Sequence, residues 1–227
     1  MITPYDWQEG IGNRAQYIEG KLEAGSPVVA LSVADGILLV TYRRQNRKLF
    51  EVYDRVAFAG IGQQSDVEVI RIAAVDFASR EGYQRSEQDV TIQRIAAAVS
   101  APIKRAFGDF SSAPFVLRCL FAEVNETADA DLFYTVDYTG DFAVSRTMAI
   151  IAGDDGVFET LKERLGEVDR SKPGADLVDA VLDHWQAAIT PEDGSLEEAL
   201  EGLKPEALLI DRSDARVDRF RLLTPEE

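Results

Sequence analysis

A short basic stretch, Arg43-Arg44-Gln45-Asn46-Arg47-Lys48, is the clearest candidate for chemistry in this sequence. It holds four of the 24 Lys and Arg residues of a chain whose formal net charge is −16. Because it joins two predicted strands, we expect it in a loop displayed at one end of a sheet. Clustered cations hold carboxylates through charge-assisted hydrogen bonds, so the functional reading is capture of a peptide C-terminus or an acidic tail. The alternative reading is an ordinary solvated hairpin loop.

Other kinds of chemistry find less support. The only histidine, His184, falls inside a predicted helix, and no Gly-x-Ser-x-Gly motif is present, which disfavours a Ser-His-Asp triad. The only cysteine, Cys119, lies within a predicted strand, where a buried and inert thiol is expected. One His and one Cys exclude a His- or Cys-based metal cluster, and no EF-hand spacing occurs, so neither a metal nor a cofactor is expected.

Glycines at Gly60 and Gly62 form only a weak phosphate-binding pattern, because the third glycine and a Lys-Ser or Lys-Thr pair are missing. On the residues alone, these glycines are expected to permit a tight turn from a strand into a helix.

The composition is acidic, with 40 Asp and Glu residues in 227. This balance argues against nucleic acid, which needs clustered cations, and against an anionic membrane surface. The apolar runs are too short for a membrane span, and the first ten residues lack a signal-peptide pattern. A single cysteine fits a reducing compartment, so a cytoplasmic location is expected.

The elements that must position these residues occur in separate blocks of strands and helices. Strands are predicted over 28–34, 37–42, 48–54, 55–60, 115–124, 132–137, 147–152, 207–211 and 217–223, and helices over 6–24, 64–81, 89–107, 156–166 and 175–188. The blocks alternate as strands, two helices, strands, two helices and strands. Segregated blocks indicate an α+β fold, and two helix pairs around strands suggest a four-layer αββα sandwich.

Five local signals refine this reading. Asp35-Gly36 predicts a type I′ hairpin turn, and Ser213-Asp214 predicts the turn of a final hairpin. Asp89 is expected to cap the helix over 89–107, and Pro102 is expected to kink or divide that helix. The acidic segment from Pro191 to Leu203 is expected to be an exposed loop and helix.

Several longer stretches resemble proteasome α-type subunits of the bacterial 20S kind, and the resemblance covers most of the chain. It rests on Gly25-Ser-Pro-Val-Val-Ala-Leu31, Asp35-Gly-Ile-Leu-Leu-Val40, Lys48-Leu-Phe-Glu-Val-Tyr-Asp-Arg-Val-Ala-Phe-Ala-Gly60, Phe77-Ala-Ser-Arg-Glu-Gly-Tyr83, Glu206-Ala-Leu-Leu-Ile-Asp211 and Arg219-Phe-Arg221. The resemblance implies the N-terminal nucleophile hydrolase sandwich. It divides the chain into a gate and helical extension over 1–24 and a single αββα sandwich domain over 25–227.

The resemblance also implies that the chain is not catalytic. Active subunits of this family use an N-terminal Thr, an acidic residue and a lysine. The matching positions here are Ser26, which is followed by Pro27, then Tyr42, and then Lys48. Only the lysine is retained, and an extension precedes Ser26.

In the α branch, the resemblance gives Lys48 another role. It implies that Lys48 pairs with the C-terminal carboxylate of an activator, with Gly62 beside the same pocket. Tyr5 and Asp6 resemble a shortened gate motif, and Tyr17 follows it. The reverse-turn proline of that motif is missing here. The implied partners are β-type subunits, further copies in a homo-heptameric ring, and a ring ATPase or other activator that inserts its C-terminal tails.

Two alternatives remain open on sequence. One is a self-processing peptidase of the same fold with Ser26 as its nucleophile. The other is a free-standing acidic scaffold protein that has kept the fold alone. Intact mass would distinguish the first alternative, and native mass would distinguish the second.

Overall fold

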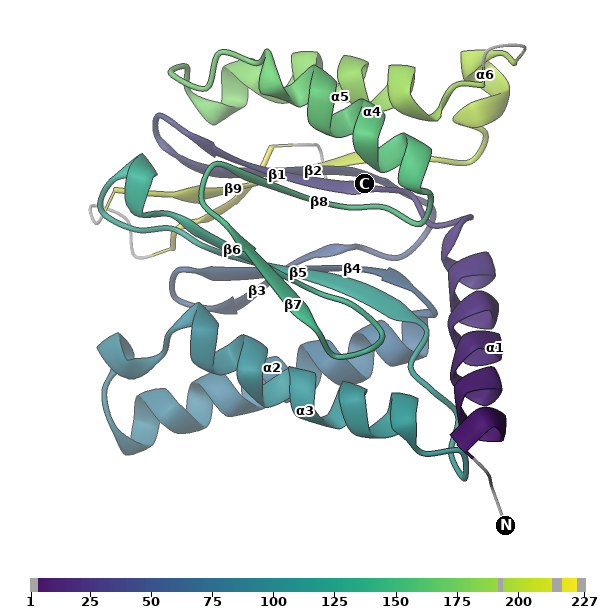
Figure 1. Cartoon of the computed structure of the whole chain (residues 1–227). Helices are drawn as coiled ribbons and strands as arrows, with labels where there is room; N and C mark the ends of the chain where they lie inside the picture. Colours follow the sequence, from purple (N-terminus) through teal and green to yellow (C-terminus); the bar gives the residue numbers. More distant parts are fainter. Residues whose placement is uncertain (1–3, 192–193, 214–217, 224–227) are drawn as a thin grey trace.

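The computed structural model describes residues 4–191, 194–213 and 218–223. Within these residues, two five-stranded antiparallel sheets are stacked face to face, and a pair of helices covers each outer face (Figure 1). The predicted four-layer αββα arrangement is therefore confirmed.

The first sheet has the strand order β10-β9-β2-β1-β8. Its strands are β1 (Val28–Val33), β2 (Gly36–Arg43), β8 (Met148–Ile151), β9 (Lys204–Asp211) and β10 (Phe220–Leu222). Its outer face is covered by α4 (Asp155–Gly166) and α5 (Gly174–Ile189), and the short α6 (Leu196–Ala199) follows α5 (Figure 1).

The second sheet has the order β3-β4-β5-β6-β7. Its strands are β3 (Leu49–Tyr53), β4 (Val56–Gly62), β5 (Leu117–Glu123), β6 (Leu132–Val136) and β7 (Phe142–Ser145). Its outer face is covered by α2 (Gln64–Gln84) and α3 (Ile92–Gly108) (Figure 1). The N-terminal helix α1 (Pro4–Leu22) runs along one end of the stacked layers (Figure 1).

The apolar side chains form three layers, one between the sheets and one beneath each helix pair. Strand β2 shows why its sequence is a continuous apolar run. Ile37 and Leu39 pack between the sheets, whereas Leu38 and Val40 pack beneath α4 and α5. A strand that is buried on both faces needs apolar residues at every position, in contrast to the alternation of a half-exposed strand.

The hairpin between β1 and β2 forms, but the predicted turn is wrong. Val33 pairs with Gly36, so Ala34 and Asp35 occupy the turn, and neither has a positive φ, which excludes type I′. Gly36 is required for another reason. A Cβ atom there would lie 1.9 Å from the main-chain oxygen of Ile210 in the neighbouring strand β9.

Two further expectations need correction. Asp89 does not cap α3: the cap position is Thr91, and Asp89 ends a separate 3-10 turn over Glu87–Asp89. α3 also continues through Pro102, so the predicted division is wrong, while the alternative of a kink there stays a prediction. Strand β7 was not predicted. Of the final hairpin, β9 and β10 do pair, while Asp214 in its expected turn lies outside the described residues.

The basic stretch does not form a hairpin loop. It connects β2 of the first sheet to β3 of the second, so it crosses from one sheet to the other. This crossing brings Lys48 to the end of the sandwich where β1 begins.

Candidate functional site

Lys48 is held at the start of β3 by contacts to two other parts of the chain. Its amine donates a hydrogen bond of 2.9 Å to the main-chain oxygen of Ser26. Its backbone N–H donates a 2.9 Å bond to Oε2 of Glu206, a buried residue of β9. The other oxygen of Glu206 lies 3.5 Å from Nε of Arg47. The basic stretch is therefore anchored at its end by one buried carboxylate.

The electrostatic environment of the Lys48 amine is unusual. Burial lowers the pKa of this amine to about 8, and the nearby Glu206 carboxylate opposes part of that shift. The amine is thus still mostly protonated at neutral pH. A partly desolvated cation of this kind attracts a carboxylate more strongly than a fully solvated lysine does.

Lys48 lines a cavity of about 520 Å³. The same cavity is lined by Gly25 and Ser26 before β1, and by Gly60 and Gly62 at the end of β4. Arg44 also lines it, so part of the basic stretch faces the same space. The structure therefore brings Lys48 and Gly62 together at one site, with a cation in the wall and glycine backbone around it.

The two glycines of β4 are there because the backbone and its neighbours approach closely. Gly62 has a φ of +119°, and a Cβ atom on it would lie 2.2 Å from the main-chain oxygen of Val116. A Cβ atom on Gly60 would lie 2.6 Å from Cγ1 of Val67 in α2. These close contacts accompany the expected tight turn from β4 into α2. The turn leaves the backbone of Gly62 accessible beside Lys48.

Ser26, Tyr42 and Lys48, which match the catalytic positions of active family members, do not form a catalytic site. The Lys48 amine binds the main-chain oxygen of Ser26 and not its hydroxyl. Tyr42 packs in the layer beneath α5, with its ring centroid 4.5 Å from that of Trp185. The Tyr42 hydroxyl accepts a hydrogen bond of 2.6 Å from the Gln186 amide. Tyr42 is therefore a packing residue that faces away from the cavity.

The three predicted gate residues all lie on α1. Tyr5 and Asp6 are in its first turn, and Tyr17 follows twelve positions later, which corresponds to about 18 Å along a helix. Both tyrosine side chains are largely exposed, at 74% and 55%. The structure therefore keeps Tyr17 apart from Tyr5 and Asp6, and none of the three lines the Lys48 cavity.

α1 itself is firmly attached to the sandwich. Arg14 donates hydrogen bonds to the main-chain oxygens of Ala106 and Ser112, at 3.0 and 2.7 Å. The Tyr138 hydroxyl donates a 2.6 Å bond to Glu19, and burial, together with this bond, raises the pKa of Tyr138. Because α1 is fixed in this way, the residues that follow it, Gly25 and Ser26, are held in place in the cavity wall.

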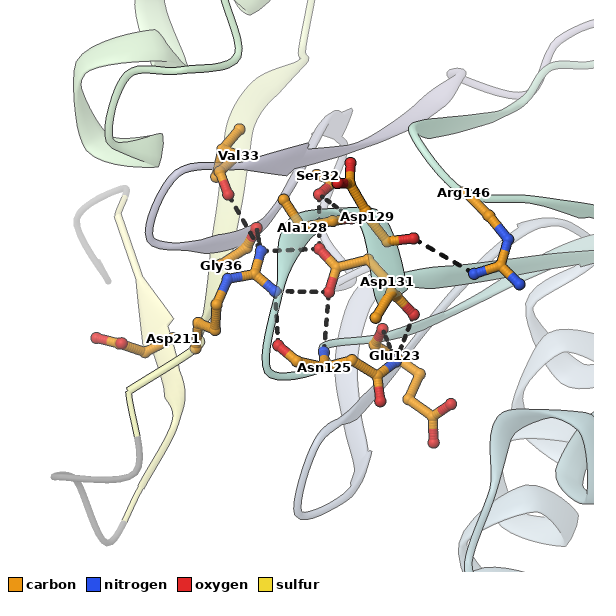
Figure 2. A network of polar contacts seen from close by, with 12 residues as sticks. Ser32, Val33, Gly36, Glu123, Asn125, Ala128, Asp129, Asp131, Arg146 and Asp211 are labelled. Carbon is orange, nitrogen blue, oxygen red and sulfur yellow. Dashed lines mark hydrogen bonds and ion pairs between the residues drawn. The ribbon is translucent and has the colours of Figure 1, made fainter.

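A polar network at the opposite end of β1 was not foreseen from the sequence (Figure 2). The buried carboxylate of Asp131 accepts hydrogen bonds from the Ser32 hydroxyl at 2.6 Å and from the Asn125 N–H at 2.8 Å. The two Nη atoms of Arg212 bind its two oxygens at 2.7 and 2.9 Å. Arg212 also donates to the main-chain oxygens of Val33 and Gly36, at 3.1 and 3.2 Å.

This network joins the first sheet, through Ser32 and Arg212, to the loop between β5 and β6 of the second sheet. Every oxygen of the Asp131 carboxylate is used within the protein, so it has none left over for a ligand. We therefore interpret it as a clamp between the sheets. Its members are spread from residue 32 to residue 212, and no local spacing in the sequence could have revealed them.

The remaining candidates behave as expected for packing residues. Cys119 is fully buried, and burial raises the pKa of its thiol, as predicted for an inert cysteine. His184 is half-buried in α5. Among the described residues, no group of three or more His, Cys, Asp or Glu side chains could hold a metal ion, and none of their helices is long and apolar enough to cross a membrane.

Two stacked antiparallel sheets between helix pairs, with a lysine at the start of β3 facing the start of β1, define the N-terminal nucleophile hydrolase class of sandwich. Comparison with known proteins narrows this class. The family described as "Proteasome subunit" matches residues 22–185. The chain therefore belongs to the proteasome subunit family.

Curated relatives within this family carry the name proteasome subunit alpha. The protein from Nocardioides sp. is 30% identical over 216 residues, which cover 94% of this chain and 82% of that protein. The protein from Frankia alni is 29% identical over 237 residues, covering 99% of this chain and 95% of that protein. The protein from Acidothermus cellulolyticus is 31% identical over 172 residues, or 74% of each chain.

Proposed function

We propose that this chain is a non-catalytic α-type ring subunit of a 20S proteasome core in the cytoplasm. In this role seven copies form a ring, the ring stacks on β-type subunits, and the ring controls entry of protein substrates. Relatives named proteasome subunit alpha across most of the chain support the assignment. The absence of a nucleophile set around Ser26 supports the non-catalytic part of it.

The single observation that carries the mechanism is the Lys48 amine in the wall of a cavity of about 520 Å³. A cation held beside accessible glycine backbone suits a peptide C-terminus, because the carboxylate binds the amine and the peptide backbone lies against Gly62. A hydrogen bond to a charged group contributes about 1.5–3 kcal/mol. We therefore assign this cavity to the C-terminal tail of an activator, such as a ring ATPase.

The exposed residues at the start of α1 support the gate assignment. Tyr5, in the first turn, presents its aromatic ring to solvent on a helix that is fixed to the sandwich, and Tyr17 does so further along the same helix. In a ring, seven copies of such a helix would place Tyr5 and Asp6 around the axial pore. Because α1 ends at the Lys48 cavity, tail binding there would act on the base of the same helix.

Assembly is the first test. The chain is co-expressed with a β-type proteasome subunit and examined by native mass spectrometry and negative-stain microscopy. We expect seven-membered rings of this chain that are stacked on the β partner. A stable monomer at micromolar concentration, with no association with the partner, would overturn the proposal and favour the free-standing acidic scaffold.

The self-processing peptidase is not favoured. Tyr42 packs against Trp185 in the layer beneath α5, and Lys48 contacts only the main chain of Ser26. An intact mass that retains residues 1–25 in the assembled ring is the expected result.

A further inference from the structure

The Lys48 amine has a property that carboxylate capture does not require. It is partly buried, points at a main-chain oxygen rather than at an acid, and borders an open cavity. An amine that is desolvated in this way loses its proton more easily than a surface lysine, and its neutral form is a nucleophile. We infer that Lys48 is an acylation site for small acyl phosphates, which enter its cavity and convert the amine to an amide.

Three features of the cavity favour this chemistry. The volume of about 520 Å³ admits a small acyl donor to the amine. Arg44 lines the same cavity and, with Arg43 and Arg47, makes the one strongly basic stretch of an acidic chain. A local cluster of this sign concentrates a dianionic phosphate where the rest of the surface repels it.

The charged groups around the amine come from two elements. Glu206 of β9 faces it and favours the protonated form. Arg44 and Arg47 lie in the crossing between the sheets. Burial outweighs the contribution of Glu206, so the pKa of the amine falls to about 8.

The reaction balances without any redox partner. The neutral Nζ attacks the acyl carbon, a C–N bond forms, and the C–O bond to phosphate breaks. Inorganic phosphate leaves with the electron pair of that bond, and one amine proton passes to phosphate or solvent. The product amide keeps one N–H, which is enough to donate to the Ser26 oxygen as the amine does now.

The expected selectivity follows from two opposing effects. Compared with an ordinary lysine of pKa about 10.4, an amine of pKa about 8 has on the order of 200-fold more neutral form at pH 7. A weaker base is also a weaker nucleophile, and a Brønsted slope of about 0.4–0.5, as for thiols, removes roughly tenfold of that gain. A net preference of about twentyfold for Lys48 over an exposed lysine remains.

The consequence for docking rests on the proposed function. Acylation removes the positive charge that would bind a tail carboxylate. A chain that carries this modification would keep its fold and lose its response to the activator. A high level of acyl phosphate would then reduce substrate entry, because acylated Lys48 no longer binds the activator tail.

The test uses the full chain and acetyl phosphate, with acetylation at each lysine followed by peptide mass spectrometry. The internal controls are five exposed lysines: Lys21, Lys104, Lys162, Lys172 and Lys204. At pH 7 we expect Lys48 to react about twentyfold faster than each of them, and its rate to level off above pH 8. The preference should vanish in 8 M urea, because unfolding removes the burial. Equal rates at all six lysines in the folded chain would overturn the inference.

A second experiment separates the contribution of the basic cluster to the acylation rate from that of the amine itself. Arg44→Gln should lower the Lys48 rate with acetyl phosphate several-fold and leave its rate with a neutral N-hydroxysuccinimide ester unchanged. Arg80→Gln, an exposed position on α2, is the matched control and should change neither rate. An equal loss with both donors in Arg44→Gln would contradict the role assigned to the cluster.

The final measurement compares acetylated and untreated rings for binding of an activator tail peptide. Selective acetylation with unchanged peptide binding would refute the regulatory consequence and the tail site, while leaving the modification site intact. Absent selectivity with normal peptide binding would refute the modification site alone.

Discussion

The amine of Lys48 donates a 2.9 Å hydrogen bond to the main-chain oxygen of Ser26. This contact joins the residue just before β3 of one sheet to the connection between α1 and β1, which leads into the other sheet. A ligand that binds the amine therefore also affects the segment around Ser26, which leads back into α1.

Replacement of Lys48 should separate assembly from activation. Lys48→Ala removes the cation and should leave ring assembly intact while it abolishes activator-stimulated proteolysis by the assembled core. Lys48→Arg is the matched control, because it keeps the charge and should retain part of the stimulation. Unchanged stimulation in Lys48→Ala would remove this residue from the docking site.

Docking should weaken at alkaline pH. Burial lowers the pKa of Lys48 to about 8, and a bound carboxylate raises that pKa again. Tail affinity is therefore constant below pH 8 and falls by up to tenfold per pH unit above it, as the free site loses its proton. Fluorescence anisotropy of a tail peptide between pH 6 and 9.5 measures this. In Lys48→Arg the affinity should stay flat over the same range, and a flat wild-type profile would contradict the assignment.

Folding stability should respond to the same amine in the opposite direction. The folded-state pKa of about 8 lies below the value of about 10.4 for an unfolded lysine. Between these values the unfolded chain binds more protons, so the contribution of Lys48 to the free energy of unfolding rises with pH. The free energy of unfolding of wild type minus that of Lys48→Met, measured by urea unfolding, should therefore become more positive from pH 8 to pH 10. No change in that difference would contradict the burial of the amine.

A methyl group at Gly62 should disturb the cavity wall. Gly62→Ala forces a non-glycine residue into a positive φ, and its Cβ would meet the Val116 oxygen. We expect a loss of about 1–3 kcal/mol in stability together with weaker tail binding. Gly12→Ala is the control. It lies in α1 with nothing within 4 Å of the new Cβ, so it should stabilise the protein by about 0.5–1 kcal/mol.

Loss of the clamp between the sheets should be costly. Asp131→Ala leaves the Arg212 guanidinium without its carboxylate, and breaking a buried pair in this way typically costs about 3–5 kcal/mol. Glu159→Ala breaks the exposed pair with Lys162 and should change stability by less than about 1 kcal/mol. Urea unfolding of both variants decides the matter. Similar losses in the two would mean that the network is not a clamp.

Sequence reasoning succeeded where the physical signal is local. The apolar runs of β1 and β2 and the stripe of Ile92, Ile95 and Val99 in α3 predicted their elements, because burial dictates residue type along a strand or helix. The order of these elements then gave the layers.

It failed where the decisive neighbour is distant in sequence. Gly36 suggested a turn residue, although its true requirement is the close approach of β9. Strand β7 was missed because Phe142 and Val144 are half-exposed, so its pattern does not report burial. The charge pattern and the family resemblance pointed to Lys48. Its contact with Ser26 depends on the crossing between the sheets, which the sequence alone does not show.

The helix that precedes Ser26 has a consequence for maturation. Ile18 and Leu22 of α1 are fully buried in the layer between the sheets, and the oxygen of Leu22 packs so closely on Gly153 that a Cβ atom there would lie 1.8 Å away. Cutting the chain before Ser26 would remove two core side chains, each contributing about 1.5–3 kcal/mol. The leader of a self-activating enzyme must be dispensable to its fold. This segment is part of the core, so its removal would destabilise the fold that it helps to form.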